Sequence, residues 1–211
     1  MKTDDLIAAL AAEAAPQPLW LPGLALRIVG ITALACGVFL LVLGLRGDLA
    51  TALMQPAIVM KTVIPALLCV LALRLAVRQA RPQLRPRAGM AVLAVPAALA
   101  AGLWLVTFAT RSPDLRFADV TPTALAECLG LIVLISALPA TMALRILQRG
   151  APTAPGLAGA LAGLAVSAGA ATGYSLFCVQ DNPLFFVTWY GAAIGIVTLA
   201  CGLAGARLLR W

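Results

Sequence analysis

Cysteines are the most prominent residues in this chain that could carry chemistry. The sequence holds five of them and no histidine. Cys128 and Cys178 lie 50 positions apart, and each lies close to one end of a long apolar stretch. Two such thiols could form a disulfide in an oxidising compartment, or bind a soft metal ion as thiolates. On spacing alone, two unpaired thiols or a static disulfide are at least as well supported.

The remaining residues offer no enzyme chemistry. The absence of histidine removes histidine bases and metal ligands, no CxxC pair occurs, and no Gly-rich phosphate loop follows a strand. Cys36, Cys69 and Cys201 fall inside apolar stretches, where cysteine usually behaves as a small apolar residue. We therefore predict that the protein is not an enzyme and has no cofactor, apart from a regulatory soft metal ion at Cys128 and Cys178.

Apolar stretches of about 20 residues must position these side chains. Hydrophobic residues make up 63% of the 211 positions and charged residues 11%, against about 25% charged in soluble domains. The sequence therefore predicts an all-α fold, a polytopic membrane protein built as a bundle of six transmembrane helices. The predicted spans are roughly 24–45, 55–75, 90–109, 123–145, 156–176 and 187–207. A short N-terminal segment, 1–20, precedes the transmembrane domain, 21–211.

The distribution of arginine predicts the orientation of the bundle. A six-span arrangement places the segments 74–89, 145–155 and 207–211 on one side, and these are rich in arginine and contain no acid. Because Lys and Arg mark the cytoplasmic side, both termini are predicted to be cytoplasmic, and Cys128 and Cys178 to lie near the outer face. Topology thereby accounts for the net charge of +7, so no direct binding to nucleic acid is expected.

The first residues, MKTDDLIAAL, predict a short cytoplasmic helix. Thr3 can cap it, and Asp4 and Asp5 lie in its first turn, where the helix dipole favours negative charge. Its expected apolar face consists of Leu6, Ile7, Leu10 and Ala14. A helix of about a dozen residues is marginal alone in water, so an apolar face with an acidic start suggests docking onto a partner. A cap that lies against the bundle or the lipid is equally consistent with the pattern.

Three ionisable residues fall inside the predicted spans. Arg27, near the inner end of the first span, can extend to the inner interface, and the other two lie at similar depth in the outer part of the membrane. Lys61 lies in the outer part of the second span and Glu127 in the outer part of the fourth. Ionisable groups inside a membrane are candidates for function, and these two could pair, with a structural ion pair as the favoured interpretation. The alternative function is a small inner-membrane transporter or channel for an ion or small solute. A transporter would tolerate deletion of 1–20, and no internal repeat of the kind found in transporters is visible.

Small residues in the last two spans predict close helix contacts. The glycine pairs four positions apart are Gly159 and Gly163, Gly169 and Gly173, and Gly191 and Gly195. Tight packing inside the bundle is the favoured interpretation of these pairs. Trp189 and Tyr190 fit an aromatic belt at the outer membrane interface.

A set of short stretches, taken in their order and spacing, carries a family resemblance. They are MKTDDLIAALA, Cys128 within the fourth span, LPATMALR, RGAPTAPGLAGALAGL, YSLFC, WYGAAIG and RLLRW. Together they resemble the NrsF-like family of six-span inner-membrane anti-sigma factors of proteobacteria. The resemblance covers nearly the whole chain and is densest in the first eleven residues and from Cys128 to Trp211.

This resemblance implies a regulatory binding protein. The cytoplasmic N-terminal segment would hold an extracytoplasmic-function sigma factor at the bacterial inner membrane, away from RNA polymerase. Cys128 and Cys178 would take part in sensing a stress outside that membrane, such as heavy metals or oxidants. The family resemblance implies a histidine where this chain has Phe177, so histidine-assisted metal binding is in doubt here. A thiol-only metal site and a disulfide switch both stay open.

Overall fold

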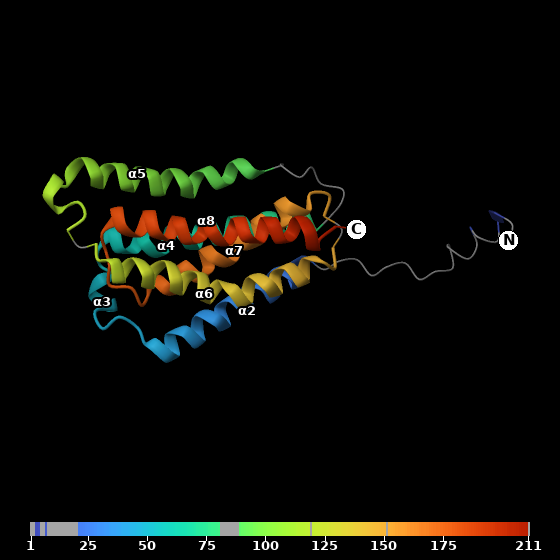
Figure 1. Cartoon of the computed structure of the whole chain (residues 1–211), viewed down its shortest axis with the longest axis horizontal. Helices are drawn as coiled ribbons and strands as arrows, with labels where there is room; N and C mark the ends of the chain where they lie inside the picture. The colour runs from blue at the N-terminus through green and yellow to red at the C-terminus, as the bar shows by residue number, and fades with distance from the viewer. Residues whose placement is uncertain are drawn as a thin grey trace.

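Six long helices run side by side and alternate in direction along the molecule (Figure 1). The computed structural model describes residues 3, 4, 7, 21–80, 89–118, 120–150 and 152–210. The helices from residue 21 onward are α2 (Leu21–Leu43), α3 (Leu49–Ala52), α4 (Pro56–Gln79), η1 (Met90–Leu93), α5 (Ala94–Thr110), η2 (Pro113–Leu115), α6 (Pro122–Leu147), α7 (Pro155–Ser175) and α8 (Pro183–Leu208). Six helical segments are long and apolar enough to cross a membrane, which confirms the predicted all-α, six-span fold.

Proline fixes where four of the long helices begin. Pro56, Pro122, Pro155 and Pro183 each lie in a first helical turn, where a missing N–H costs no helical hydrogen bond. The predicted spans agree with the observed ones to within four residues. The largest differences are the second span, which extends to Gln79, and the last, which begins at Pro183.

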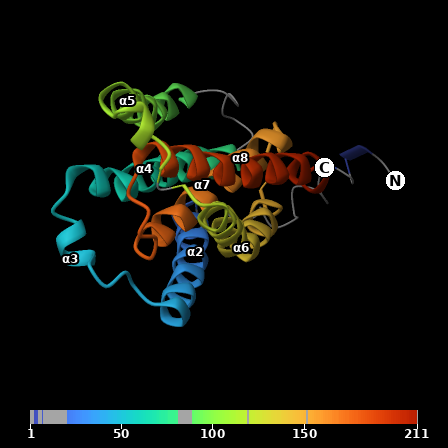
Figure 2. The ribbon, with the colours of Figure 1, turned by 60° about the vertical axis from the view of Figure 1, so that its left-hand side comes forward.

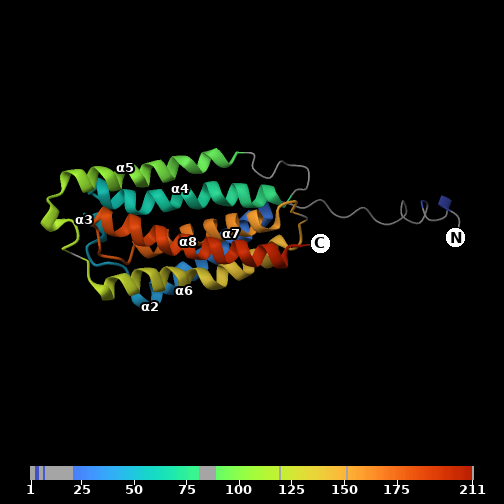
Figure 3. The same cartoon turned by 45° about the horizontal axis from the view of Figure 1, so that its top comes forward.

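α7 lies at the centre of the bundle, with α2, α4, α6 and α8 around it (Figures 2 and 3). Its sequence is mostly alanine and glycine, and residues on every side of it are buried. Such small residues let neighbouring backbones come close, so that a Cβ added at Gly205 of α8 would lie 2.8 Å from the Cα of Gly159. A Cβ at Gly163 would lie 2.6 Å from the Cβ of Cys201, and one at Gly173 2.6 Å from the Sγ of Cys36. The predicted close packing is confirmed for these glycines.

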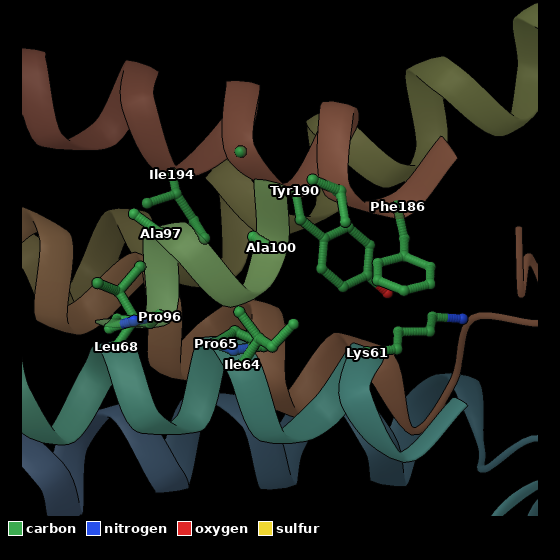
Figure 4. A pocket seen from close by; sticks show the side chains of 12 residues that line it. Lys61, Ile64, Pro65, Leu68, Pro96, Ala97, Ala100, Phe186, Tyr190 and Ile194 are labelled. Carbon is green, nitrogen blue, oxygen red and sulfur yellow. The ribbon is translucent and has the colours of Figure 1, made fainter. Parts of the chain in front are cut away.

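Gly191 and Gly195 do not follow that pattern. Beyond their own stretch of helix, no described atom lies within 4 Å of a Cβ added at either position, so the predicted close contact is wrong for this pair. Gly191 lines an apolar cavity of about 120 Å³ between α4, α5 and α8 (Figure 4). α5 packs chiefly against α4 and α8 at the edge of the bundle, so it leaves this side of α8 loosely covered.

The two ends of the bundle carry different segments of the chain. α2 begins and α8 ends at one end, called here the C-terminal end, while the connection 176–182 between α7 and α8 lies at the other, the Cys178 end (Figure 1). Arg78, Arg145 and Arg207 lie near the C-terminal end, as a six-span arrangement requires. Which end faces the cytoplasm stays a prediction.

Candidate functional site

Cys128 and Cys178 lie together at the Cys178 end of the bundle. Cys128 is in the second turn of α6, and Cys178 is in the connection between α7 and α8. They are 0% and 5% exposed and belong to one cluster of buried side chains. The structure therefore brings together the two cysteines that the sequence singles out. All five cysteines are free thiols, and a role for these two in a disulfide or a metal site stays a prediction.

Aromatic rings surround these thiols. Tyr174 lies beside Phe177 and Tyr190, with ring centres 5.9 and 5.7 Å apart, and Phe177 meets Phe39 of α2 edge-on at 5.4 Å. Tyr174 and Tyr190 both interact with Cys178. Tyr190 is only 4% exposed, so its predicted place in an interfacial belt is wrong. Its buried hydroxyl has no hydrogen-bond partner among the described residues.

A fully buried lysine holds the backbone beside Cys178. Lys61, in the second turn of α4, is 0% exposed. Its Nζ donates to the carbonyl oxygens of Cys178 at 2.6 Å and of Gln180 at 2.8 Å, and lies 3.2 Å from Oδ1 of Asp181. Figure 4 shows the amine turned away from the apolar cavity. Each of its three protons has an acceptor, which is what allows a lysine to be buried at all.

A buried arginine reaches the same backbone from beyond the end of α2. Nη1 of Arg46 donates to the carbonyl of Cys178 at 3.3 Å and to Oδ1 of Asp181 at 2.8 Å. Nη2 donates to Oδ2 of Asp181 at 2.8 Å, and the guanidinium also bonds both oxygens of Asp48, at 2.8 and 2.9 Å. Arg46, Lys61 and Asp181 are called the Cys178 clamp below, because two cations meet at one carboxylate and one carbonyl.

The ion-pair partner of Lys61 is therefore not the predicted one. Lys61 pairs with Asp181, whereas Glu127 is exposed on α6. Consecutive residues of a helix point about 100° apart, so a helix that buries Cys128 turns the preceding side chain outward. The prediction that Lys61 and Glu127 pair with each other is wrong for this geometric reason.

Arg46 and Lys61 keep the carboxylates of Asp181 and Asp48 ionised. Burial raises the pKa of Asp181, but hydrogen bonds from Arg46 and the charge of Lys61 outweigh that effect, so the pKa lies below its usual value. The hydrogen bonds from Arg46 likewise lower the pKa of Asp48, and the two aspartates together raise the pKa of the Arg46 guanidinium. The two buried cations are thus balanced by two carboxylates.

The chain after Cys178 is also fixed from a third direction. Asn182 caps α8 by accepting a hydrogen bond from the Leu184 amide at 3.1 Å. Its Nδ2 donates to the carbonyl of Arg116, in the connection between α5 and α6, at 2.9 Å. The connection that contains Cys178 is therefore held by α4, by the chain that follows α2 and by the connection that precedes α6.

The N-terminal residues predicted to bind a partner are described only in part. Thr3, Asp4 and Ile7 are helical and exposed, with Ile7 at 59%. The others in the prediction, Asp5, Leu6 and Leu10, lie outside the described residues. The binding role of this segment stays a prediction.

The chemistry available at the Cys178 end is that of thiols. Among the residues that the structure describes, no three His, Cys, Asp or Glu side chains converge as they would around a metal ion. A soft metal ion here would have two thiolates as its ligands from these side-chain types. A disulfide would need only Cys128 and Cys178 themselves.

The sequence reasoning missed the clamp because its contacts join distant parts of the chain. Arg46 and Asp181 are 135 positions apart, and Lys61 and Cys178 are 117 apart. One signal was available. Asp181 is the only charged residue in its connection, and Lys61 lies at the same end of the bundle among apolar neighbours, so each charge needed a partner there.

Comparison with known proteins gives full-length matches. The family described as "Negative regulator of sigma F" (NrsF) matches residues 9–211. The "Anti-sigma-F factor NrsF" of Caulobacter vibrioides (strain NA1000 / CB15N) is 34% identical over 222 residues, covering all of both chains. The "Probable anti-sigma-F factor NrsF" of Azospira oryzae is 32% identical over 220 residues, again covering all of both chains. No solved structure matches the chain.

Proposed function

The chain belongs to the NrsF family of anti-sigma factors, and from that premise we propose that it captures an extracytoplasmic-function sigma factor through residues 1–20 and releases it on a periplasmic stress sensed at Cys128 and Cys178. As a member of this family it is a regulator and not an enzyme, and its partner is a sigma factor. The type of sigma factor, the capturing segment, the orientation and the sensing step are our proposals. The observation that best supports the sensing step is the joint burial of two thiols beside one clamp.

Capture is assigned to the N-terminal segment because of its chemistry. Leu6, Ile7 and Leu10 offer an apolar face that a groove on a sigma factor would bury, and binding would order a helix that is marginal alone. Asp4 and Asp5 would face the basic surface with which a sigma factor binds DNA. Residues 21–211 would then serve as the membrane domain that anchors and controls this segment.

The orientation follows from arginine. The C-terminal end of the bundle carries arginine-rich segments and would face the cytoplasm of a bacterial inner membrane. The Cys178 end would then face the periplasm, which is where oxidants and metal ions arrive. Residues 1–20 would be in the cytoplasm with the sigma factor.

α2 is the element that would connect the two ends. It begins directly after the proposed capture segment, and the chain that follows it carries Arg46 to the Cys178 carbonyl. Hydrogen peroxide could take two electrons and two protons from Cys128 and Cys178, giving a disulfide and two waters. A soft cation would instead displace both thiol protons. Either change would pull on the backbone that Arg46 and Lys61 hold, and so bias α2 between two positions.

The proposal is tested with a promoter that depends on the sigma factor, in cells carrying the full-length protein. Cys128→Ser with Cys178→Ser should change the response to cadmium or to a peroxide, whereas Cys69→Ala with Cys201→Ala should leave it unchanged. A normal response in the first variant would remove these cysteines from the sensing step. Deletion of 1–20 should raise basal transcription, and a deletion that leaves the sigma factor captured would disprove the assignment of that segment.

A further inference from the structure

The C-terminal end of the bundle carries a basic cleft between α2 and α6. Arg27 of α2 and Arg145 and Arg149 at the end of α6 line it, together with Gly30 and Met142, and its volume is about 490 Å³. All three arginines are exposed. None of them forms an ion pair with a described residue, since the ion pairs within the described ranges all involve Arg46 or Lys61. Three arginines that have no ion-pair partner among the described residues therefore line one cleft.

An apolar groove along the same two helices adjoins the basic cleft. Ile31 lines both, and the groove continues over α2 to Leu43 and over α6 from Leu138 back to Leu131, with a volume of about 500 Å³. From Ile31 to Leu43 the groove runs for about 18 Å at 1.5 Å per residue. Its walls include some of the most exposed apolar side chains of the bundle, such as Val42 at 76% and Leu134 at 69%. α2 and α6 are in contact, and Figure 1 shows them meeting toward the C-terminal end.

We propose that the α2–α6 groove is a binding site for one anionic phospholipid, with its phosphate at Arg27, Arg145 and Arg149 and one acyl chain along the groove. A basic pocket between transmembrane helices that leads into an apolar groove matches such a lipid in both charge and shape. Each guanidinium can donate two parallel hydrogen bonds to phosphate oxygens. The site goes beyond the capture and sensing functions and rests only on the six-span fold.

A second groove of the molecule lacks this combination. The space between α2, α4 and α7, about 320 Å³, is lined by Thr32, Thr172, cysteines and apolar residues, and none of the described residues that line it is charged. It would receive a lipid tail without preference for the head group. The charge at the mouth of the α2–α6 groove is therefore what makes that site selective.

The test measures binding of phosphatidylglycerol and phosphatidylcholine with identical acyl chains to the purified full-length protein by native mass spectrometry. Phosphatidylglycerol should bind at least about 10-fold more tightly, and Arg27→Gln with Arg145→Gln should lower its affinity at least about 10-fold, since each cation near a lipid surface contributes several-fold. Arg207→Gln with Arg210→Gln removes the same charge at the same end and should change affinity less than about 3-fold. Equal affinities for the two lipids, or an equal loss of phosphatidylglycerol affinity in both variants, would disprove the proposed site.

The groove is tested separately. Leu134→Trp should fill it and weaken binding, whereas Leu199→Trp, on α8 and equally exposed at 69%, should not. Glycerophosphoglycerol, which has no acyl chains, should not compete, and competition by it would show a site for free phosphate only. If the arginine variant bound phosphatidylglycerol normally but lost the sigma factor, the cleft would be a protein-binding surface and the proposal would be wrong.

Discussion

Removing the charge of Asp181 should free Cys178 to react. Asp181→Asn leaves Lys61, at 0% exposure, with two carbonyl acceptors and without the carboxylate that it contacts. Loss of one partner of a buried ion pair costs about 3–5 kcal/mol, and the lower value applies here because the Asp181 side chain is 27% exposed. If Cys178 reacts only when the connection 176–182 opens, about 3 kcal/mol corresponds to a rate roughly 100-fold higher.

The assay is the rate of alkylation of Cys178 by a membrane-impermeant maleimide. The protein for this assay has its other four cysteines replaced by alanine. Asp114→Asn, at an exposed aspartate of the same end, is the matched control and should have no effect. Lys61→Met combined with Asp181→Asn should react more slowly than Asp181→Asn alone, because the uncompensated buried charge is gone. A change of less than about 3-fold in Asp181→Asn, or equal rates in the single and double variants, would refute the reasoning.

Three further outcomes are expected. Leu6→Ala with Leu10→Ala should weaken capture of the sigma factor at least ~10-fold in co-purification, because burying one Leu contributes ~1.5–3 kcal/mol. Undiminished capture would show that these side chains do not insert into a groove on the sigma factor. Gly205→Leu should lower the free energy of unfolding in detergent by ~2 kcal/mol or more, because its Cβ would meet Gly159, while Gly195→Leu, facing open space, should not. The pKa of Asp181 is lower in the folded protein than in the unfolded chain, where it is about 3.9. The clamp therefore contributes fully to the free energy of unfolding above about pH 3.9, and this contribution is lost only as the pH falls through the lower pKa of the folded state. Alkylation of Cys178, corrected for its thiolate fraction, should therefore not change between about pH 7 and 5.

The spans and the meeting of the two cysteines could be predicted because both follow from one-dimensional signals. Apolar length sets the spans, and the number of crossings between Cys128 and Cys178 decides that they share an end. The exact ends of the spans were harder to predict. Pro183 begins α8 four residues before the predicted start, because a proline that starts a helix lies in a stretch that hydropathy alone assigns to the connection.

The clamp could not be predicted in the same way. Lys61 is bound mainly by backbone carbonyls, which every residue possesses and no sequence pattern marks. The pairing of Lys61 with Glu127 was predicted from their similar depth in the membrane. Depth does not show on which side of its helix Glu127 lies, and that side decides whether the two residues can meet. A prediction that used the 100° step from Cys128 would have turned Glu127 outward and left Asp181 as the partner of Lys61.

The central position of α7 has a consequence for how the protein is made. The small residues that let four helices pack around it also leave it with the lowest mean hydropathy of the six spans, 1.4 against 1.9–2.4 for the others. Such a segment is the least able to enter lipid by itself as it leaves the ribosome, and it gains most from entering as a hairpin with α8. Cys178 lies at the tip of that hairpin. The proposed pair of cysteines would therefore be completed only after α7 has been made, so a chain truncated within α7 would lack Cys178 along with its last span.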